Sequence, residues 1–391
     1  MSDPNRALTE PVAPAEAAGR DRWPGWLRIL LLLALLYLFL VAVNLLEGGI
    51  KGLGEEAAQD LFAGVANPIA GLAVGILATV LVQSSSVTTS IIVGLVGSGE
   101  LSVALAVPMV MGANIGTTVT NTLVSIGHVR RNAEFRRAFA AATVHDFFNV
   151  LAVIVFLPLE LATGFLHKSA LFLAREVSAA LGGTDAAFHS PIKAAVKAGA
   201  GAVADFLAAV GLAGGWLAAV MIALGVALIF VSLFLITRNM KRLIAARAEQ
   251  VLNAALERAA LFAIAIGTLV TIAVQSSSIT TSLLVPLCGA GILSLEAAFP
   301  VMLGANIGTT ITAFLASLAA DKLAGMEIAL VHVLFNVIGV ALVYPLPAVR
   351  RVPLRLASGL AERTVEHKML VMAYVGGLFV LGPLLALFLF R

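Results

Sequence analysis

Two hydroxyl-rich segments of this chain have nearly the same sequence. Residues 83–90 read QSSSVTTS and residues 275–282 read QSSSITTS, displaced by 192 positions. Serine and threonine hydroxyls donate hydrogen bonds to an oxyanion and offer lone pairs to a cation. A single serine in an apolar helix usually bonds back to its own backbone. A cluster of hydroxyls beside a glutamine, present twice, instead favours an ion-binding site.

A second polar motif recurs at the same displacement. GANIGTTVT at 112–120 is repeated as GANIGTTIT at 304–312. The glycines of this motif allow helices to approach closely. Its asparagine and threonines offer the oxygen ligands that a hard cation such as sodium prefers. The alternative is a glycine-mediated helix contact in which the threonines are incidental.

A third motif, HDFFN at 145–149, aligns with HVLFN at 332–336, now displaced by 187. Asp146 is the one carboxylate well inside a repeat segment, and its counterpart is Val333. An acid at membrane depth is by default a functional candidate, able to bind a cation or to carry a proton. The alternative is an aspartate at a helix end near the interface, since Arg136 lies only ten residues before it. The histidine and asparagine of both copies are expected to be structural hydrogen-bonding residues.

The elements that position these motifs must cross a membrane. The chain is 60% apolar and 12% charged, with a mean hydropathy of +1.02, whereas soluble domains carry about 25% charged residues. Nine or more stretches approach spanning length, for example 27–46, 217–236 and 369–390. These unbroken apolar runs lack the alternation of a membrane barrel. The predicted fold is therefore an all-α integral membrane protein.

The apolar runs beside the first QSSS segment, 75–82 and 91–96, are each too short to span a bilayer. We therefore predict two short helices that meet at a break, as in a re-entrant element. Backbone is tolerated at such a break only where it lines a wet cavity walled by protein. Half-helix N-termini there present free N–H groups and a partial positive charge, which suits an anion.

The distribution of charge predicts that the two repeats are inverted. The loop at 130–137 contains four arginines, whereas its counterpart at 321–327 contains none. The segment after Pro158 has mixed charge, but the one after Pro345 is basic. Because basic loops face the cytoplasm, corresponding loops lie on opposite sides. This is the inverted repeat of secondary transporters, with substrate bound near the midplane; a duplication that only serves helix packing is the alternative.

The predicted organisation has six parts, with both termini cytoplasmic. They are a disordered tail (1–26), a first transmembrane helix with an outer loop (27–66), repeat 1 (67–158), a connecting region of amphipathic and transmembrane helices with a basic cytoplasmic linker (159–258), repeat 2 (259–345), and a basic segment with a final transmembrane helix (346–391). Cys288 is the only cysteine, which excludes an intrachain disulfide.

Basic residues are missing around both polar motifs. No lysine or arginine occurs between Lys51 and Arg130, or between Arg258 and Lys322. A dianion bound there would have no fixed cationic side chain, and uncompensated charge at membrane depth costs several kcal/mol. Cations that bind together with the anion can supply the compensation. The sequence thus predicts cation coupling without identifying the cation.

The chain resembles the type II sodium-dependent phosphate cotransporter family over about residues 75–350. The segments that carry the resemblance are LVQSSSVTTSIIV, PMVMGANIGTTVTNTLV, EFRRAFAAATVHDFFN and LPLE in the first half, and VQSSSITTS, LGANIGTTITA and HVLFN in the second. The resemblance implies an inverted-repeat carrier whose QSSS elements form the phosphate site and contribute to the sodium sites. In this family an aspartate at the position of Asp146 accompanies electrogenic transport, which implies three sodium ions moving with one divalent phosphate.

The chain also departs from the family pattern. Animal members have a large disulfide-bearing outer loop, whereas the 159–212 connection has no cysteine. The loop at 128–132 lacks the acidic residue common in relatives. No PhoU-like domain follows residue 391, so the chain resembles a compact bacterial member of the family.

The sequence therefore predicts sodium-coupled symport of inorganic phosphate across the plasma membrane by alternating access. No cofactor is expected, since sodium is a co-transported substrate; the expected partners are phosphate, sodium and the lipid bilayer, without nucleic acid. The oligomeric state stays open, with a dimer as one option. The predicted phosphate ligands are Ser84, Ser85, Ser86, Ser276, Ser277, Ser278, Asn114 and Asn306. The predicted sodium ligands are Gln83, Gln275, Asp146, Thr88, Thr117, Thr118, Thr280, Thr309 and Thr310.

Two other readings stay open at this point. One is a sodium-coupled carrier of another oxyanion, such as sulfate or arsenate. The other is an ion channel lined by the same hydroxyls. An enzyme is not expected, because no GxSxG elbow or metal-binding motif accompanies the serines.

Overall fold

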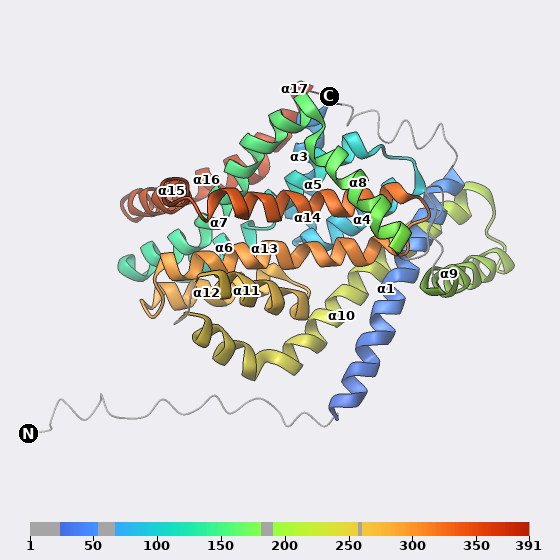
Figure 1. The fold of residues 1–391 in the computed structure, drawn as a ribbon, viewed down its shortest axis with the longest axis horizontal. Coiled ribbons are helices and arrows are strands. Elements are labelled where there is room, and N and C mark those ends of the chain that lie inside the picture. Colours follow the sequence, from blue (N-terminus) through green and yellow to red (C-terminus); the bar gives the residue numbers. More distant parts are fainter. Residues whose placement is uncertain (1–23, 54–66, 181–190, 257–259, 391) are drawn as a thin grey trace, which may run out of the picture.

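The computed structural model describes residues 24–53, 67–180, 191–256 and 260–390, and all regular structure within them is helical (Figure 1). Most of the predicted tail and the predicted outer loop at 54–66 lie outside the described residues. The helices are α1 (Gly25–Leu53), α3 (Pro68–Val82), α4 (Ser85–Ser98), α5 (Val103–Gly116), α6 (Val119–Ile126), α7 (Asn132–Thr163), α8 (Phe165–Ala180), α9 (Pro191–Ala209), α10 (Gly214–Leu256), α11 (Ala260–Val274), α12 (Ser277–Gly289), α13 (Leu295–Ser317), α14 (Leu323–Val343), α15 (Pro347–Glu366), α16 (Met369–Gly376), η2 (Gly377–Leu381) and α17 (Gly382–Phe390).

Seven helical segments of the described chain are long and apolar enough to cross a membrane. They are Gly25–Leu53, Val103–Ile126, Asn132–Thr163, Gly214–Asn239, Leu295–Ser317, Leu323–Val343 and Met369–Phe390. Four shorter apolar helices, α3, α4, α11 and α12, accompany them. The prediction of an all-α membrane protein is thereby confirmed. The predicted final span does form, but the π-helical turn η2 interrupts it.

Burial separates inner from outer helices. In the most apolar 18 residues of each segment, 83% are buried in α5–α6 and 78% in α13, but only 17% in the segment from α16 to α17. Helix α1 packs lengthwise against α10 (Figure 1), and only 28% of the most apolar 18 residues of α10 are buried. Because an outer helix of a membrane protein faces lipid, its exposed apolar side chains need no protein partner. The helices that carry the GANIGTT motifs are therefore inner helices, whereas α10 and α16–α17 are outer ones.

The two predicted repeats have the same local packing. Gly75 and Gly112 of the first repeat leave room for the backbone of the neighbouring helix, since a Cβ on either would meet a backbone carbonyl of α5 or α3. Gly267 and Gly304 do the same between α11 and α13. Such small residues let two helix backbones approach closely. Both repeats thus hold a short helix directly against the GANIGTT helix.

Contacts between the repeats are reciprocal. Helix α4 packs against α13 and α14 of the second repeat, while the corresponding helix α12 packs against α6 and α7 of the first. Reciprocal contacts of this kind arise between copies related by a two-fold axis. The predicted opposite orientation of the two copies in a membrane remains a prediction.

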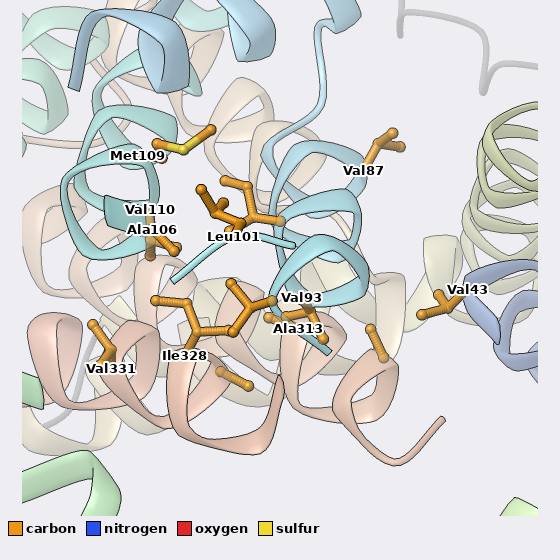
Figure 2. Close-up of a cluster of buried hydrophobic side chains, with 14 of the residues drawn as sticks. Val43, Val87, Val93, Leu101, Ala106, Met109, Val110, Ala313, Ile328 and Val331 are labelled. Carbon is orange, nitrogen blue, oxygen red and sulfur yellow. The ribbon is translucent and has the colours of Figure 1, made fainter. Parts of the chain in front are cut away.

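Apolar side chains from both repeats form one shared core. Figure 2 shows Val93 of α4 and Ala106 of α5 beside Ile328 of α14 and Ala313 of α13. All four are essentially inaccessible to solvent. Burial of such side chains contributes roughly 25 cal/mol for each Å² removed from water. Residues more than 200 positions apart along the chain thus fix the geometry of the polar motifs that lie next to this core.

Candidate substrate and cation site

Both QSSS segments break their helices in the same way. Gln83 follows α3 with a φ of 55° and Gln275 follows α11 with a φ of 56°, and these are the only non-glycine residues of the described chain with positive φ. The serine after each glutamine is extended and begins the next helix. Left-handed backbone at a non-glycine residue costs of order 1 kcal/mol or more. The predicted breaks are therefore confirmed, and the same unfavourable conformation occurs at both.

A threonine of the same repeat holds each left-handed glutamine. The Thr120 hydroxyl donates to Oε1 of Gln83 at 3.2 Å, and the Thr312 hydroxyl donates to Oε1 of Gln275 at 2.9 Å. Thr120 lies at the start of α6 and Thr312 lies within α13, so each bond joins the break to the residues directly after GANIGTT. An amide oxygen has two lone pairs, so one stays available on each glutamine. The glutamines therefore keep an oxygen that can coordinate a cation.

The first serine of each motif caps the second short helix. The Ser84 hydroxyl accepts from the Val87 amide at 3.3 Å, and the Ser276 hydroxyl accepts from the Ile279 amide at 3.4 Å. These N-cap bonds satisfy one of the four free N–H groups of a helix start. The remaining N–H groups leave a partial positive charge at the beginnings of α4 and α12.

The next two serines of each motif have free hydroxyls. No side-chain hydrogen bond of Ser85, Ser86, Ser277 or Ser278 is formed within the described part of the chain. Ser85, Ser86 and Ser277 are nevertheless buried. Hydroxyls in the first turn of a helix that have no protein partner keep their protons free, which suits an anionic ligand.

The predicted sodium-binding threonines behave differently from these serines. Each donates to a carbonyl of its own helix. The bonds run from Thr88 to Ser84 (3.1 Å), Thr280 to Ser276 (3.3 Å), Thr117 to Ala113 (2.9 Å), Thr309 to Ala305 (3.0 Å), Thr118 to Ile115 (2.8 Å) and Thr310 to Ile307 (2.7 Å). A hydroxyl whose proton is engaged in this way has lone pairs left for a cation and no proton for an anion. Thr280 also accepts from the hydroxyl of Thr271 at 2.9 Å, which leaves it one lone pair.

The asparagines of the two GANIGTT motifs are joined by a buried network. Nδ2 of Asn149 donates to the backbone oxygen of Asn114 at 2.9 Å, and Nδ2 of Asn306 donates to Oδ1 of Asn149 at 2.7 Å. The ring of His145 also bonds to Oδ1 of Asn306. All four residues are at most 3% exposed. The structure therefore brings Asn114 and Asn306 together through α7.

The other half of this network lies on α14. Oδ1 of Asn114 accepts from Nδ2 of Asn336 at 3.3 Å and lies 3.4 Å from Nε2 of His332. The side chains of Asn114 and Asn306 are thus engaged in contacts between helices. Their predicted role as phosphate ligands remains a prediction, as do the roles of the serines and threonines.

Asp146 lies near the middle of α7 and is fully buried. Oδ2 accepts from the hydroxyl of Tyr374 at 2.7 Å, and the carboxyl lies beside the side chain of Thr118. Oδ1 has no hydrogen-bond partner. Two predicted sodium ligands, Asp146 and Thr118, are therefore neighbours. A buried carboxylate oxygen that lacks a protein donor is suited to a cation.

The structure does not join the two serine clusters directly. No hydrogen bond links 84–86 to 276–278 within the described ranges. The repeats meet instead at Asn121 of α6, whose Oδ1 accepts from Thr281 at 2.9 Å and from Ser282 at 3.2 Å. Convergence of both breaks on one ion stays a prediction.

Several residues at this site were not predicted from the sequence. They are Thr120 and Thr312, which hold the glutamines, Asn121, which links the repeats, and Tyr374, which bonds to Asp146. The two threonines recur at the displacement of 192, so the repeat itself could have identified them. Asn121 aligns with Ala313, and Tyr374 lies outside both repeats. No comparable signal marks these two.

Apolar spanning helices around two broken helices and a buried polar network define a polytopic membrane protein of the transporter class. Comparison with known proteins identifies the family. The family described as Na+/Pi-cotransporter matches residues 38–176 and 228–351, which is more than half of the chain. The chain therefore belongs to the Na+/Pi-cotransporter family and is a transporter rather than an enzyme, as the sequence predicted. No solved structure matches it significantly.

Individual relatives agree with this assignment. The chain is 36% identical to "Sodium-dependent phosphate transport protein 2A" of Rattus norvegicus, over 91% of this chain and 67% of the relative. It is 37% identical to the protein of the same name from Oryctolagus cuniculus, over 91% and 66%. It is 32% identical to "Sodium-dependent phosphate transport protein 2B" of Homo sapiens, over 91% and 64%.

Proposed function

We propose that this protein couples the movement of inorganic phosphate across the plasma membrane to that of sodium. Membership of the Na+/Pi-cotransporter family supports sodium-coupled phosphate transport. The observation within the molecule that carries the proposal is the pair of equivalent breaks. Each break places free serine hydroxyls in the first turn of a short helix, beside threonines whose protons are engaged.

The two kinds of hydroxyl divide the ligands between the ions. Ser85, Ser86, Ser277 and Ser278 keep their protons free, so they are assigned to phosphate together with Ser84, Ser276, Asn114 and Asn306. The repeat threonines and Gln83 and Gln275 keep oxygen lone pairs free, so they are assigned to sodium. Hydrogen-bond donors select anions and oxygen lone pairs select hard cations.

Sodium is needed because the site has no fixed positive side chain. Neither the 52–129 nor the 259–321 segment contains a lysine or arginine. Helix N-termini contribute only about half an elementary charge each. Two such ends do not neutralise a dianion and the buried Asp146 together. Bound sodium ions supply the remaining charge, so phosphate and sodium bind as a set.

The stoichiometry that we assign is the one that the family resemblance implies for a carrier with an aspartate at the position of Asp146. We assign three sodium ions to each divalent phosphate, which moves one net positive charge per cycle. Asp146 holds one of these ions with Thr118. Alternating access then exposes the loaded site to each side in turn, as the repeat core moves relative to the outer helices α1 and α10. Both chain termini are assigned to the cytoplasmic side by the arginine-rich loops.

Uptake of labelled phosphate into proteoliposomes tests the proposal. The purified protein is reconstituted, and uptake is measured with a sodium gradient, with a potassium gradient and with no gradient, while valinomycin clamps the membrane potential. We expect saturable uptake only with sodium, and faster uptake when the interior is negative. Phosphate uptake that is equal in sodium and potassium would contradict the coupling.

Two further arms separate the rival readings. Unlabelled sulfate or arsenate is added during uptake at the same concentration as phosphate. Inhibition by either ion as strong as that by unlabelled phosphate would indicate a broader oxyanion carrier. The double variant Ser85→Ala with Ser277→Ala removes one free hydroxyl from each motif, and we expect a rise in the KM for phosphate. The double variant Ser98→Ala with Ser317→Ala is the control, since both of these hydroxyls bond to their own helices.

A further inference from the structure

A cavity of about 580 Å³ lies between α15 and the start of α13. Arg350, Arg351 and Arg355 of α15 line it, together with Tyr344. The guanidinium of Arg350 stacks over the Tyr344 ring, 4.9 Å from its centroid. Stacking of this kind holds a guanidinium in place while its N–H groups stay free to donate.

None of these three arginines forms an ion pair with another residue of the described chain. Two carboxylates, Glu296 and Glu362, also line the cavity, but neither is bonded to the arginines. The lining therefore has an excess of positive charge with uncommitted donors. Guanidinium groups of this kind match the geometry of a phosphate group, to which they can donate in pairs.

An exposed apolar stripe on helix α15 indicates the depth of the cavity in the membrane. Leu346, Val349, Val352 and Leu356 recur at helical spacing and are 38–52% exposed. By the period of 3.6 residues, Arg351 and Glu362 lie roughly opposite this stripe, and Arg350 and Arg355 lie on its two flanks. A helix with an exposed apolar stripe opposite a basic face lies in the membrane interface. The arginine cavity is then at the depth of lipid headgroups.

We propose that this cavity binds the phosphate group of an anionic phospholipid. The guanidinium groups of Arg350 and Arg355 donate to the phosphodiester oxygens, while the exposed stripe of α15 contacts the acyl region. This site is separate from the transport site, because none of its lining residues belongs to the QSSS, GANIGTT or HDFFN motifs. Basic groups near a membrane surface attract anionic lipid.

Lipid retention by the purified protein tests the proposal. The protein is incubated in detergent micelles with phosphatidylglycerol or with phosphatidylcholine, and bound lipid is counted by native mass spectrometry. We expect the wild type to retain phosphatidylglycerol. The variant Arg350→Gln with Arg355→Gln should bind it at least about tenfold more weakly. The matched control is Arg363→Gln, an exposed arginine of the same helix that does not line the cavity. Equal retention by the double variant would overturn the proposal.

Free inorganic phosphate carries the same kind of group as the lipid. A competition experiment distinguishes these two ligands. A large excess of inorganic phosphate is added to wild type loaded with phosphatidylglycerol. We expect the lipid to stay bound, and displacement by phosphate would assign the cavity to a soluble anion and overturn the lipid proposal. If the double variant does not fold, wild type alone decides, because equal retention of phosphatidylcholine and phosphatidylglycerol also contradicts the proposal.

Discussion

The hydroxyl of Tyr374 donates a hydrogen bond of 2.7 Å to Oδ2 of Asp146. The two residues are 228 positions apart, and Tyr374 lies on α16, outside the residues that match the family. The bond leaves Oδ1 of Asp146 without a partner. One carboxylate oxygen is thus held by the C-terminal segment, while the other is buried without a hydrogen-bond partner.

Substitution of Tyr374 by phenylalanine removes this bond with little change of volume. We expect the apparent affinity for sodium to fall by about tenfold, because a hydrogen bond to a charged group contributes about 1.5 kcal/mol or more. The phosphate KM at saturating sodium should change much less. The measurement is the sodium dependence of phosphate uptake. Tyr37→Phe, which removes a hydroxyl bonded to the carbonyl of Ala195, is the matched control, and identical sodium curves for both variants would contradict the role of Tyr374.

Replacement of Asp146 tests the charge carried in each cycle. In Asp146→Gly and in the closer isostere Asp146→Asn, the buried negative charge that we assign to one sodium ion is lost. We expect phosphate uptake to continue at a reduced rate but to become independent of membrane potential. Uptake is compared at two valinomycin-clamped potentials, with the exposed Asp205→Asn as control. A potential dependence equal to that of wild type would refute the assigned role of Asp146.

Asn149 connects the two GANIGTT motifs, and its loss should affect both. Asn149→Ala leaves the Asn114 carbonyl and the Asn306 amide without the bonds that they now form. Each buried polar group without a partner costs about 1–3 kcal/mol. We expect a clear drop in the melting temperature of the purified protein and a loss of uptake. Asn132→Ala at the exposed start of α7 serves as control. A melting temperature equal to that of wild type would show that the network contributes no stability.

Much of this site could be predicted because the chain contains it twice. The glutamine and serines of QSSS recur with the same spacing, and the same φ near 55° recurs with them. A local break depends on local residues, so the sequence contains enough information to locate it. The alternation of long apolar runs likewise predicted the spanning helices, because bilayer thickness sets their length.

Contacts between distant segments could not be predicted in this way. Tyr374 lies in an apolar helix without a motif, and only the contacts of its side chain with α7 identify Asp146 as its partner. Glu47 is similar: it accepts from the backbone amide of Asp321 at 3.2 Å across 274 positions. Such pairs depend on how helices pack, and hydrophobic periodicity does not specify which polar groups will then meet.

The paired glycines offer a test of the repeat itself. A Cβ at Gly75 or Gly267 would meet a backbone carbonyl of the neighbouring helix, at Met109 or Val301. We expect Gly75→Ala and Gly267→Ala to reduce the melting temperature by similar amounts, since backbone cannot move aside as a side chain can. Gly201→Ala is the control, because its Cβ meets no atom and alanine stabilises a helix by about 0.5–1 kcal/mol over glycine. Unequal effects of the two variants would show that the repeats are not packed equivalently.

Asp321 lies between α13 and α14, where it pairs with Lys51 at 2.9 Å and with Lys197 at 2.7 Å. Burial alone would raise the pKa of its carboxyl, but hydrogen bonds from Lys197 and Lys51 outweigh burial and hold the pKa below its ordinary value of 3.8. A lowered pKa stabilises the folded state above the ordinary value, and this stability is lost as the pH falls toward the folded pKa. We therefore expect Asp321→Asn to melt at a lower temperature than wild type at pH 7. The difference should shrink as the pH falls below about 4. Melting curves of both proteins between pH 3 and pH 8 provide the measurement, with Asp205→Asn as the exposed control. A difference that stays constant across this range would show that Asp321 acts through packing rather than through its charge.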